Sequence, residues 1–399
     1  MRARVVLGVS GGIAAFRAVE VLRLLVKAGC HVHPILTRNA ARFVTPRTFA
    51  VLAHETAQVS LWSHRTGAGI DHTELSRIAD LLVVAPATAN VLAKMSAGVA
   101  DDALTTYALA HRRGIVLAPA MNTVMWQQPA IQDALATLQR RGARVVAPVS
   151  GVLADGEIGE GKLAAPESIA AAVLEALPRR GPLAGLRVVV SAGPTRERLD
   201  AVRVITNRSS GRMGIAVALA ARELGAEVVL LAGPTVAVPV GVRSERFESA
   251  ADLETLLTAA GEADVLFHAA AVADFRPAVV ADGKLDRRHG AISVELEPVA
   301  DLAAGVARQT RRPYLVIFAA ERAADLEERA RRKLDDKGAD AVVANPIDEE
   351  GVGMEAEDNR ALVMTQQGLR RFLARQRKET LARELVLALA GELVAAARR

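Results

Sequence analysis

Residues 4–36 read RVVLGVSGGIAAFRAVEVLRLLVKAGCHVHPIL, and this stretch decides the fold class. Two mainly apolar runs, at 4–9 and 31–36, flank a stretch at 13–28 whose apolar residues recur with helical spacing. Strands that are apolar at nearly every position are buried on both faces, as in parallel sheets covered by crossover helices. The stretch therefore predicts a strand, a helix and a second, parallel strand.

The same alternation fills the rest of the chain in two series. Apolar runs complete the first series at 81–86, 115–119 and 144–148, and form the second at 187–193, 227–233, 264–271, 314–321 and 340–345. Between the series lies PRRGPLAGL, at 178–186, whose proline and glycine content is typical of a linker. We predict two doubly wound, Rossmann-like α/β domains, at 1–180 and 181–399, with a last helix at 378–397.

Composition excludes several classes of protein. Of the 399 residues, 51% are hydrophobic and 24% are charged, and no apolar run approaches the roughly 20 residues that a membrane helix needs. The one cysteine, Cys30, excludes an intramolecular disulfide and any site with several thiolate ligands. The first residues lack the pattern of a signal peptide, so we expect a cytoplasmic protein with no membrane partner.

The charge distribution favours small anionic ligands. The formal net charge is +5, but the basic residues are mostly interleaved with acidic ones. Aromatic residues make up only 3% of the chain, which is too few for evident base-stacking surfaces. We therefore expect phosphorylated metabolites as ligands and no nucleic acid.

The loops that follow the predicted strands are the expected place for a site, because open parallel sheets bind ligands beyond the carboxyl ends of their strands. The glycine turn at 8–12 would let a phosphate approach the backbone, but a turn made only for packing explains it equally well. Three further loops carry polar motifs: ATAN at 87–90, AMNTVMW at 120–126 and GVLADGEIGEGKL at 151–163.

In these loops the chain resembles the flavin-dependent cysteine decarboxylases. Over nearly its whole length it resembles the bifunctional coenzyme A biosynthesis family, which joins phosphopantothenoylcysteine decarboxylase to phosphopantothenate–cysteine ligase; PAMNTVMW at 119–126 is highly specific. The resemblance implies a flavodoxin-like N-terminal domain that binds FMN. The implied FMN contacts are Ser10, Gly11, Gly12, Ile13, Thr37, Thr88 and Asn90.

The resemblance also implies the chemistry of the first domain. Loss of carbon dioxide from a cysteine carboxyl needs an electron sink, which a flavin provides by oxidising the carbon that bears the sulfur. Asn122 is expected to hold the substrate carboxylate beside Met121, and His72 to act as the base in the oxidation. Taken without the resemblance, His72 reads as a surface or core histidine and Met121 as a core residue.

Asp155 departs from the family pattern, because the corresponding position is normally a cysteine that protonates the product. An ordinary aspartate has a pKa of about 3.9 and is a poor proton donor at neutral pH, although burial could raise that value. Three interpretations stay open: Asp155 replaces the acid, water delivers the proton, or the reduction step is impaired beside an active ligase. An introduced substitution is a further alternative.

In the second half, residues 191–214 read SAGPTRERLDAVRVITNRSSGRMG and join a strand to a helix through small and polar residues. Alone, this segment fits an ordinary Rossmann-like turn, and NAD binding is the alternative, although no GxGxxG motif is present. Lysine is rare, with seven among fifty lysines and arginines. Lys284, Lys333 and Lys337 therefore suit a crowded triphosphate, unless they are ordinary surface residues.

The resemblance implies that this half is a ligase that uses CTP and Mg²⁺ to convert 4'-phosphopantothenate into an acyl-cytidylate, which cysteine then attacks. Asn207 is expected to steady that intermediate, and Lys284 to neutralise charge at the transferred group. The other implied substrate contacts are Arg203, Ala270, Ala271, Asp274, Asp301, Phe318, Lys333 and Lys337. Two runs depart from the family pattern: 284–287 reads KLDR, and 299–302 reads VADL.

The resemblance finally implies a homo-oligomer, with trimers of the N-terminal domain and dimers of the C-terminal domain, as in a dodecamer. A non-catalytic flavoprotein is the alternative for the first half. His72 together with Asn122 argues against it, whereas Asp155 leaves it open.

Overall fold

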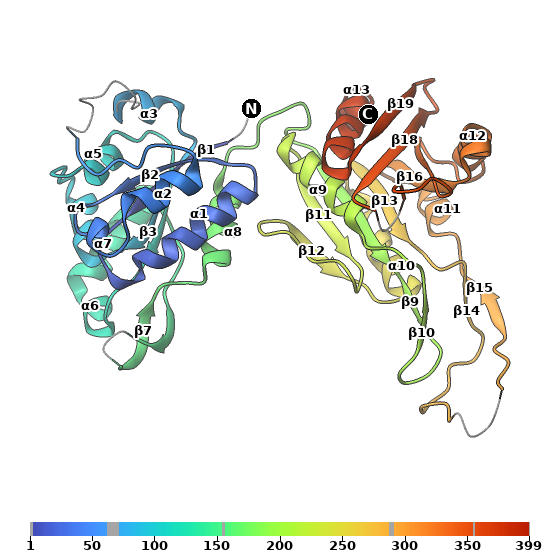
Figure 1. Cartoon of the computed structure of the whole chain (residues 1–399), viewed down its shortest axis with the longest axis horizontal. Coiled ribbons are helices and arrows are strands. Elements are labelled where there is room, and N and C mark those ends of the chain that lie inside the picture. Colours follow the sequence, from blue (N-terminus) through green and yellow to red (C-terminus); the bar gives the residue numbers. More distant parts are fainter. Residues whose placement is uncertain (1–2, 62–71, 154–155, 287–290, 354–355, 399) are drawn as a thin grey trace. The chain divides into compact units, whose positions relative to one another are not determined.

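A computed structural model describes residues 3–61, 72–153, 156–286, 291–353 and 356–398. The chain divides into two compact units, Met1–Pro178 and Arg179–Arg399, here called unit 1 and unit 2 (Figure 1). The boundary between them along the chain falls within residues 178–186, the segment whose proline and glycine content is typical of a linker. Each unit has its own central sheet and its own buried core.

The sheet of unit 1 is parallel and has the strand order β2-β1-β3-β4-β5. Its strands are β1 (Arg4–Val9), β2 (His31–Leu36), β3 (Leu81–Ala87), β4 (Gly114–Pro119) and β5 (Arg144–Val145). This is the flavodoxin-like order, in which the chain reverses its direction of travel across the sheet between β1 and β3. The fold predicted for this half is confirmed.

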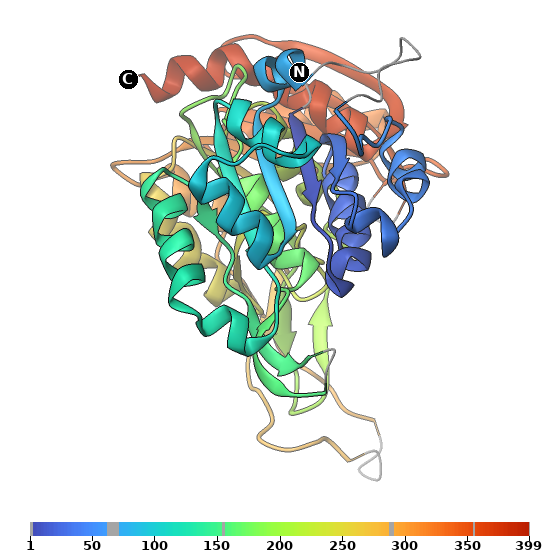
Figure 2. The same ribbon diagram turned by 90° about the vertical axis from the view of Figure 1, so that its left-hand side faces the viewer.

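Helices cover both faces of this sheet (Figure 2). One group contains α1 and α8, which contact each other, and the other contains α4, α5 and α7. The helical segments of unit 1 are η1 (Ile13–Arg17), α1 (Ala18–Lys27), η2 (Ala40–Arg42), α2 (Pro46–Ala53), α3 (His72–Ile78), α4 (Ala89–Ala97), α5 (Ala103–Ala110), α6 (Thr123–Gln127), α7 (Pro129–Arg140) and α8 (Pro166–Ala176).

The first helix differs from the single helix predicted at 13–28. It starts as the 3₁₀ segment η1 and becomes an α-helix only at Ala18. Gly12 precedes it with an extended backbone and offers no side chain as a cap, and the N–H of Ala15 donates to the Gly12 carbonyl. The first turn is therefore wound tightly on i→i+3 bonds.

A hairpin follows the sheet of unit 1. Its strands β6 (Val149–Val152) and β7 (Ile158–Lys162) are antiparallel. The Gly161 carbonyl accepts a hydrogen bond from the N–H of Met121 at 2.9 Å, so the hairpin attaches to the loop that follows β4.

The eight-stranded sheet of unit 2 has the order β12-β11-β8-β13-β16-β17-β18-β19. Its strands are β8 (Arg187–Pro194), β11 (Glu227–Ala232), β12 (Arg243–Arg246), β13 (Val265–Ala271), β16 (Tyr314–Glu321), β17 (Ala341–Pro346), β18 (Asp358–Thr365) and β19 (Arg370–Arg377). The first six are parallel and follow the classic Rossmann order, in which the connection reverses between β8 and β13. The fold predicted for this half is confirmed as well.

Strands β18 and β19 are antiparallel and were not predicted. β19 reads RRFLARQR, is rich in arginine and is exposed at most positions, unlike the apolar runs of the parallel strands. An exposed edge strand does not need a continuous apolar sequence, so the sequence pattern that reveals the buried strands is absent there.

Helices cover both faces of this sheet too. Buried residues of α9 and α13 join one core cluster, and those of α10, α11 and α12 join another on the opposite face. The helical segments are α9 (Arg212–Glu223), α10 (Ala250–Ala259), η3 (Ala260–Glu262), α11 (Leu302–Ala307), η5 (Ala323–Asp325), α12 (Leu326–Asp336) and α13 (Lys378–Ala397). Two small antiparallel ribbons pair β9 (Arg196–Arg198) with β10 (Val204–Thr206) and β14 (Phe275–Pro277) with β15 (Leu296–Pro298). Among the described residues no helix is long and apolar enough to span a membrane.

Candidate functional sites

Ser10 joins the two strands that flank the reversal point of unit 1. It follows β1 and is fully buried, and its Oγ donates to the Pro86 carbonyl at 2.7 Å and accepts from the N–H of Thr88 at 2.9 Å. The Ser10 hydroxyl therefore fixes the loop after β1 against the loop after β3.

The glycines after Ser10 allow the loops to lie close together. A Cβ on Gly11 would lie 2.3 Å from Asn39 Cβ and 2.8 Å from the Asn39 carbonyl carbon, so only glycine fits there. A Cβ on Gly12 would lie 3.3 Å from Thr88 Cγ2, which is a tighter contact than most. The loops after β1, β2 and β3 therefore lie side by side at the carboxyl ends of these strands.

The other residues predicted to contact FMN lie along the same edge. Thr37 follows β2, is buried, and accepts a hydrogen bond from the N–H of Ala40 through its Oγ1. Thr88 is the N-cap of α4, and Asn90 is exposed in its first turn. Ile13, at the start of η1, is 59% exposed although it is apolar. Backbone amides and hydroxyls beside an exposed apolar surface suit a ligand with a phosphate and a flat ring, which fits FMN.

The loop after β4 brings in the PAMN motif. The Asn122 Oδ1 accepts from the N–H of Val124 at 2.8 Å, which fixes the orientation of the carboxamide at the start of α6. Met121 is half-buried and packs against the core cluster. A Cβ on Gly161 would lie 2.3 Å from the Met121 carbonyl oxygen, so the hairpin also lies close to this loop.

Two predicted catalytic residues of unit 1 are not fully described. His72 is the first residue of α3, and its side chain lies outside the described part of the chain. Asp155 lies outside the described residues altogether.

Asn207 lies at the reversal point of unit 2. Its Nδ2 lies 3.2 Å from the Ala271 carbonyl oxygen and 2.9 Å from that of Val272, and it donates to both. Fully buried Thr195, which follows β8, accepts from the N–H of Ala273 through Oγ1 at 3.0 Å. The structure therefore brings Asn207 together with Ala270 and Ala271 at the end of β13.

Arg203 and the segment of Lys284 meet at the buried Asp200. The Asp200 Oδ2 lies 3.2 Å from an Arg203 nitrogen and accepts from the N–H of Leu285 at 3.1 Å. Desolvation alone would raise the pKa of Asp200, but hydrogen bonds from the N–H groups of Val202, Leu285 and Arg203 outweigh it and lower this pKa. Lys284 is exposed beside this junction, and Asp274 is exposed after β13.

The two other lysines extend from the end of α12 toward acidic groups. Lys333 Nζ lies 2.7 Å from a Glu321 carboxylate oxygen, and Lys337 Nζ lies 3.0 Å from one of Asp301. Asp301 is also the N-cap of α11 and accepts from the N–H of Ala304. Phe318 of β16 is half-buried against the core.

Sequence reasoning missed a buried polar pair next to these groups. Ser191 Oγ lies 2.9 Å from His268 Nδ1 and accepts from the N–H of Ala270 at 3.2 Å. Burial, helped by the charge of Lys337 and opposed by that of Asp301, lowers the pKa of His268 to about 4. A histidine inside the apolar run VLFHAAA at a reversal-point strand is the signal that could have identified this pair.

The comparisons with known proteins fit this geometry. Residues 1–177 match the family described as "Flavoprotein", and residues 183–392 match "DNA/pantothenate metabolism flavoprotein C-terminal domain". The chain is 38% identical over 370 residues to "Coenzyme A biosynthesis bifunctional protein CoaBC" of Vibrio vulnificus (strain CMCP6), covering 92% of both chains. It is 41% identical over 400 residues to the protein of that name from Mycobacterium bovis, covering 96% of this chain and 95% of the relative.

The chain belongs to the CoaBC family. The predicted family and the prediction of a bifunctional enzyme of coenzyme A biosynthesis, a ligase and decarboxylase, are thereby confirmed. A solved structure of the C-terminal domain of a CoaBC protein is 34% identical, with a TM-score of 0.46, and covers 54% of this chain and 99% of its own.

The pKa of His268 predicts a pH-dependent stability of unit 2. Unfolded histidine binds a proton near pH 6.5, whereas folded His268 does so only near pH 4, so acidification between these values favours the unfolded state. Between pH 7 and 4, the free energy of unfolding of the parent is expected to fall by up to about 3 kcal/mol more than that of His268→Asn.

Urea unfolding measures this difference. Both tryptophans, Trp62 and Trp126, belong to unit 1, so tryptophan fluorescence follows the unfolding of unit 1 alone. Circular dichroism follows both units, and the part of its change that fluorescence does not report is the unfolding of unit 2. An equal loss of stability in parent and variant would show that His268 does not titrate in this way.

Proposed function

We propose that unit 2 ligates cysteine to 4'-phosphopantothenate with CTP, and that unit 1 then decarboxylates 4'-phosphopantothenoylcysteine to 4'-phosphopantetheine with FMN. The observation that carries this proposal is the position of the motif residues at the reversal points of two separate sheets, where doubly wound folds bind nucleotides. We assign residues 1–180 to the decarboxylase and 181–399 to the ligase, and both activities to the cytoplasm.

In unit 1, FMN when bound supplies the electron sink that loss of carbon dioxide requires. The backbone at Ser10, Gly11 and Gly12 would hold its phosphate, because these residues follow a strand and open a helix. Thr37, Thr88 and Asn90 would add polar contacts, and exposed Ile13 an apolar one.

The substrate would lie between these loops and the PAMN loop. Asn122, whose carboxamide is already oriented by Val124, would bind the substrate carboxylate beside Met121. His72 would take the proton during oxidation. The hairpin attached at Met121 would cover the substrate. Asp155, which lies between the two hairpin strands in sequence, would then be the candidate for the acid that protonates the product.

In unit 2, the substrate carboxylate would attack the α-phosphorus of CTP, release pyrophosphate and form the acyl-cytidylate. Lys284 would neutralise the charge that develops at the transferred group, and Asn207 would steady the acyl-cytidylate until cysteine displaces CMP. The triphosphate would lie near Lys333 and Lys337, with Phe318 and Asp301 close by. Mg²⁺ would accompany the nucleotide, with Asp274 facing this complex.

Arg203 would bind the phosphate of the 4'-phosphopantothenate held by a neighbouring subunit, and Ala270 and Ala271 would supply backbone contacts to the substrate. The present partner of Arg203, Asp200, keeps the guanidinium beside the segment of Lys284. We further propose a homo-oligomer built from trimers of unit 1 and dimers of unit 2. Exposed apolar side chains near the flavin loops, Ile13, Phe16 and Phe43, support a covered surface there.

Replacing Gly11 tests the FMN site. In Gly11→Ala the new methyl group collides with backbone and Cβ of Asn39, so FMN affinity is expected to fall about tenfold or more. The bound flavin is measured by its visible absorbance after desalting. Gly391→Ala is the matched control, because it adds a methyl group at an exposed helix position with no atom within 4 Å. An equally yellow Gly11→Ala protein would place the flavin elsewhere.

Two variants test the ligase site. Lys284→Gln removes the charge and is expected to slow pyrophosphate release from CTP about 100-fold. Asn207→Asp places a carboxylate against the carbonyls of Ala271 and Val272, so product formation is expected to fall more than pyrophosphate release. Lys27→Gln, at an exposed position of α1, is the control. Parent rates in both site variants would show that the site is misplaced.

Asp155 is tested by measuring carbon dioxide and reduced product together across pH. A carboxyl that donates the last proton has to be protonated in the closed complex, so reduced product is expected to fall with rising pH more steeply than carbon dioxide. Asp155→Asn is expected to release oxidised product, and Asp155→Cys to flatten the pH dependence near neutrality. Parent yields from Asp155→Asn at every pH would leave water as the donor, whereas a parent that never forms reduced product would favour the impaired alternative.

A further inference from the structure

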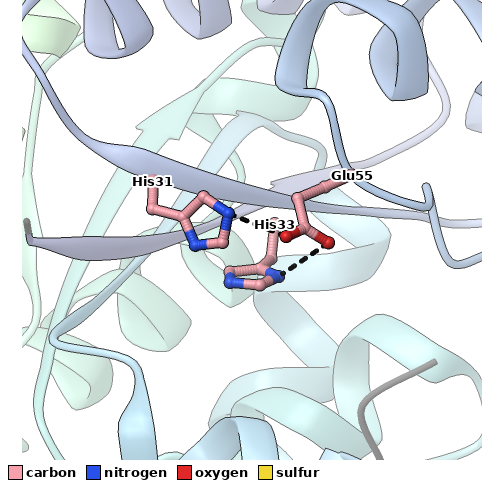
Figure 3. Close-up of side chains that lie close together, drawn as sticks. All are labelled: His31, His33 and Glu55. Atoms are coloured by element: carbon pink, nitrogen blue, oxygen red, sulfur yellow. Dashed lines mark ion pairs between the residues drawn. The ribbon is translucent and has the colours of Figure 1, made fainter. Parts of the chain in front are cut away.

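Three side chains that neither proposed site uses lie close together at the outer strand of unit 1 (Figure 3). His31 and His33 are two residues apart in β2, so their side chains project from the same face of the sheet. Their ring centroids are 4.5 Å apart, with the rings nearly perpendicular. Glu55 reaches them from the segment that follows α2.

The carboxylate of Glu55 faces both imidazoles with different oxygens. Oε1 lies 2.7 Å from His31 Nε2, and Oε2 lies 3.8 Å from His33 Nδ1. One possible ligand atom from each residue lies within 4.8 Å of the other two. Tetrahedral ligands at about 2.0–2.2 Å from a zinc ion are roughly 3.4 Å apart, so small side-chain movements bring all three to one ion. Among the described residues this is the one such group of three.

The backbone before Glu55 has an unusual conformation. His54 has φ 54° and ψ 33°, and it is the one non-glycine residue with positive φ in the described part of the chain. This conformation costs an ordinary residue roughly 1–2 kcal/mol. It ends α2 and turns the chain so that Glu55 lies against β2.

Burial is graded across the three side chains. The His33 side chain is only 8% exposed, against 28% for Glu55 and 37% for His31. Burial lowers the pKa of His33, which favours the neutral imidazole that a metal ion binds. The Nε2 of His33 has no hydrogen-bond partner among the described residues. The ring is therefore oriented by its other nitrogen, Nδ1, which faces the Glu55 carboxylate. The more exposed side of the group leaves room for a further ligand from solvent.

We propose that His31, His33 and Glu55 bind one divalent transition-metal ion, of which Zn²⁺ is the representative. Two imidazole nitrogens and one carboxylate oxygen suit zinc, cobalt or nickel, whereas Mg²⁺ and Ca²⁺ prefer oxygen ligands alone. Such an ion ties the start of β2 to the end of α2. Arg4 of β1, opposite His31 in the strand register, adds a positive charge nearby and limits the affinity.

The role of this ion is structural. His31 begins β2 and Thr37 follows its last residue, so about 20 Å of strand separates His31 from the flavin loops, and about 13 Å separates His33 from them. The inference therefore does not depend on the proposed reactions.

Cobalt is the spectroscopic probe for this site. The full chain is stripped with EDTA and titrated with Co²⁺, which is expected to give d–d absorption with one ion per chain, displaced by Zn²⁺ but not by Mg²⁺. Glu55→Gln and His31→Gln each remove one ligand and are expected to weaken binding at least about tenfold. His54→Asn is the matched control, because it removes an adjacent exposed histidine and asparagine tolerates positive φ.

Thermal unfolding gives a second measurement. Zn²⁺ is expected to raise the unfolding midpoint of unit 1, followed by tryptophan fluorescence, in the parent and His54→Asn but not in Glu55→Gln. Circular dichroism of each metal-free variant verifies that it is folded. The proposal is overturned if the parent binds no Co²⁺, if folded Glu55→Gln and His31→Gln bind it as the parent does, or if His54→Asn loses binding to the same extent.

Discussion

One buried hydroxyl at each reversal point is the contact on which both sites depend. In unit 1, Ser10 Oγ accepts from the N–H of Thr88, and in unit 2, Thr195 Oγ1 accepts from the N–H of Ala273. Both side chains are fully buried, and each joins the loop after the first strand of its sheet to the loop after the strand across the reversal. A buried, satisfied hydrogen bond of this kind resists displacement, so the loops around it keep fixed positions.

Three positively charged side chains proposed for the ligase site of unit 2 are each paired with a carboxylate. Lys333, Lys337 and Arg203, all predicted to bind phosphates, each contact a carboxylate: Glu321, Asp301 and Asp200 respectively. The pairs of Lys333 and Lys337 are partly exposed and contribute at most about 1 kcal/mol each, so an incoming anion exchanges with Glu321 or Asp301 at little cost. Asp200 is buried and holds Arg203 more firmly. Glu321 and Asp301 therefore hold the two lysines in place without blocking them, and the nearby His268 stays neutral instead of adding another charge.

The sequence was sufficient to predict the features that recur along the chain, which are the buried strands and the helices between them. Apolar runs between helices predict both parallel sheets, and the family motifs identify the loops. It did not predict β18, which is mostly buried, or β19, whose exposed and arginine-rich sequence lacks the apolar run of a buried strand. Nor did it show that Ser10 supports a loop instead of facing outward. Nor could it predict His31 and Glu55 as neighbours, because this contact depends on the positive φ of His54.

Aspartates at the amino ends of the strands hold neighbouring strands together, as the buried hydroxyls do at the carboxyl ends. Three parallel strands are preceded by Ala-Asp, at 79–80, 263–264 and 339–340. Asp80, Asp264 and Asp340 each donate their N–H to a carbonyl at the start of the neighbouring strand and accept the N–H of the same residue through the side chain. A strand start leaves such an N–H without a ladder partner, and the carboxylate supplies one. Because aspartates occupy the amino ends of these strands, the carboxyl ends, with their small and polar loops, are left for ligands.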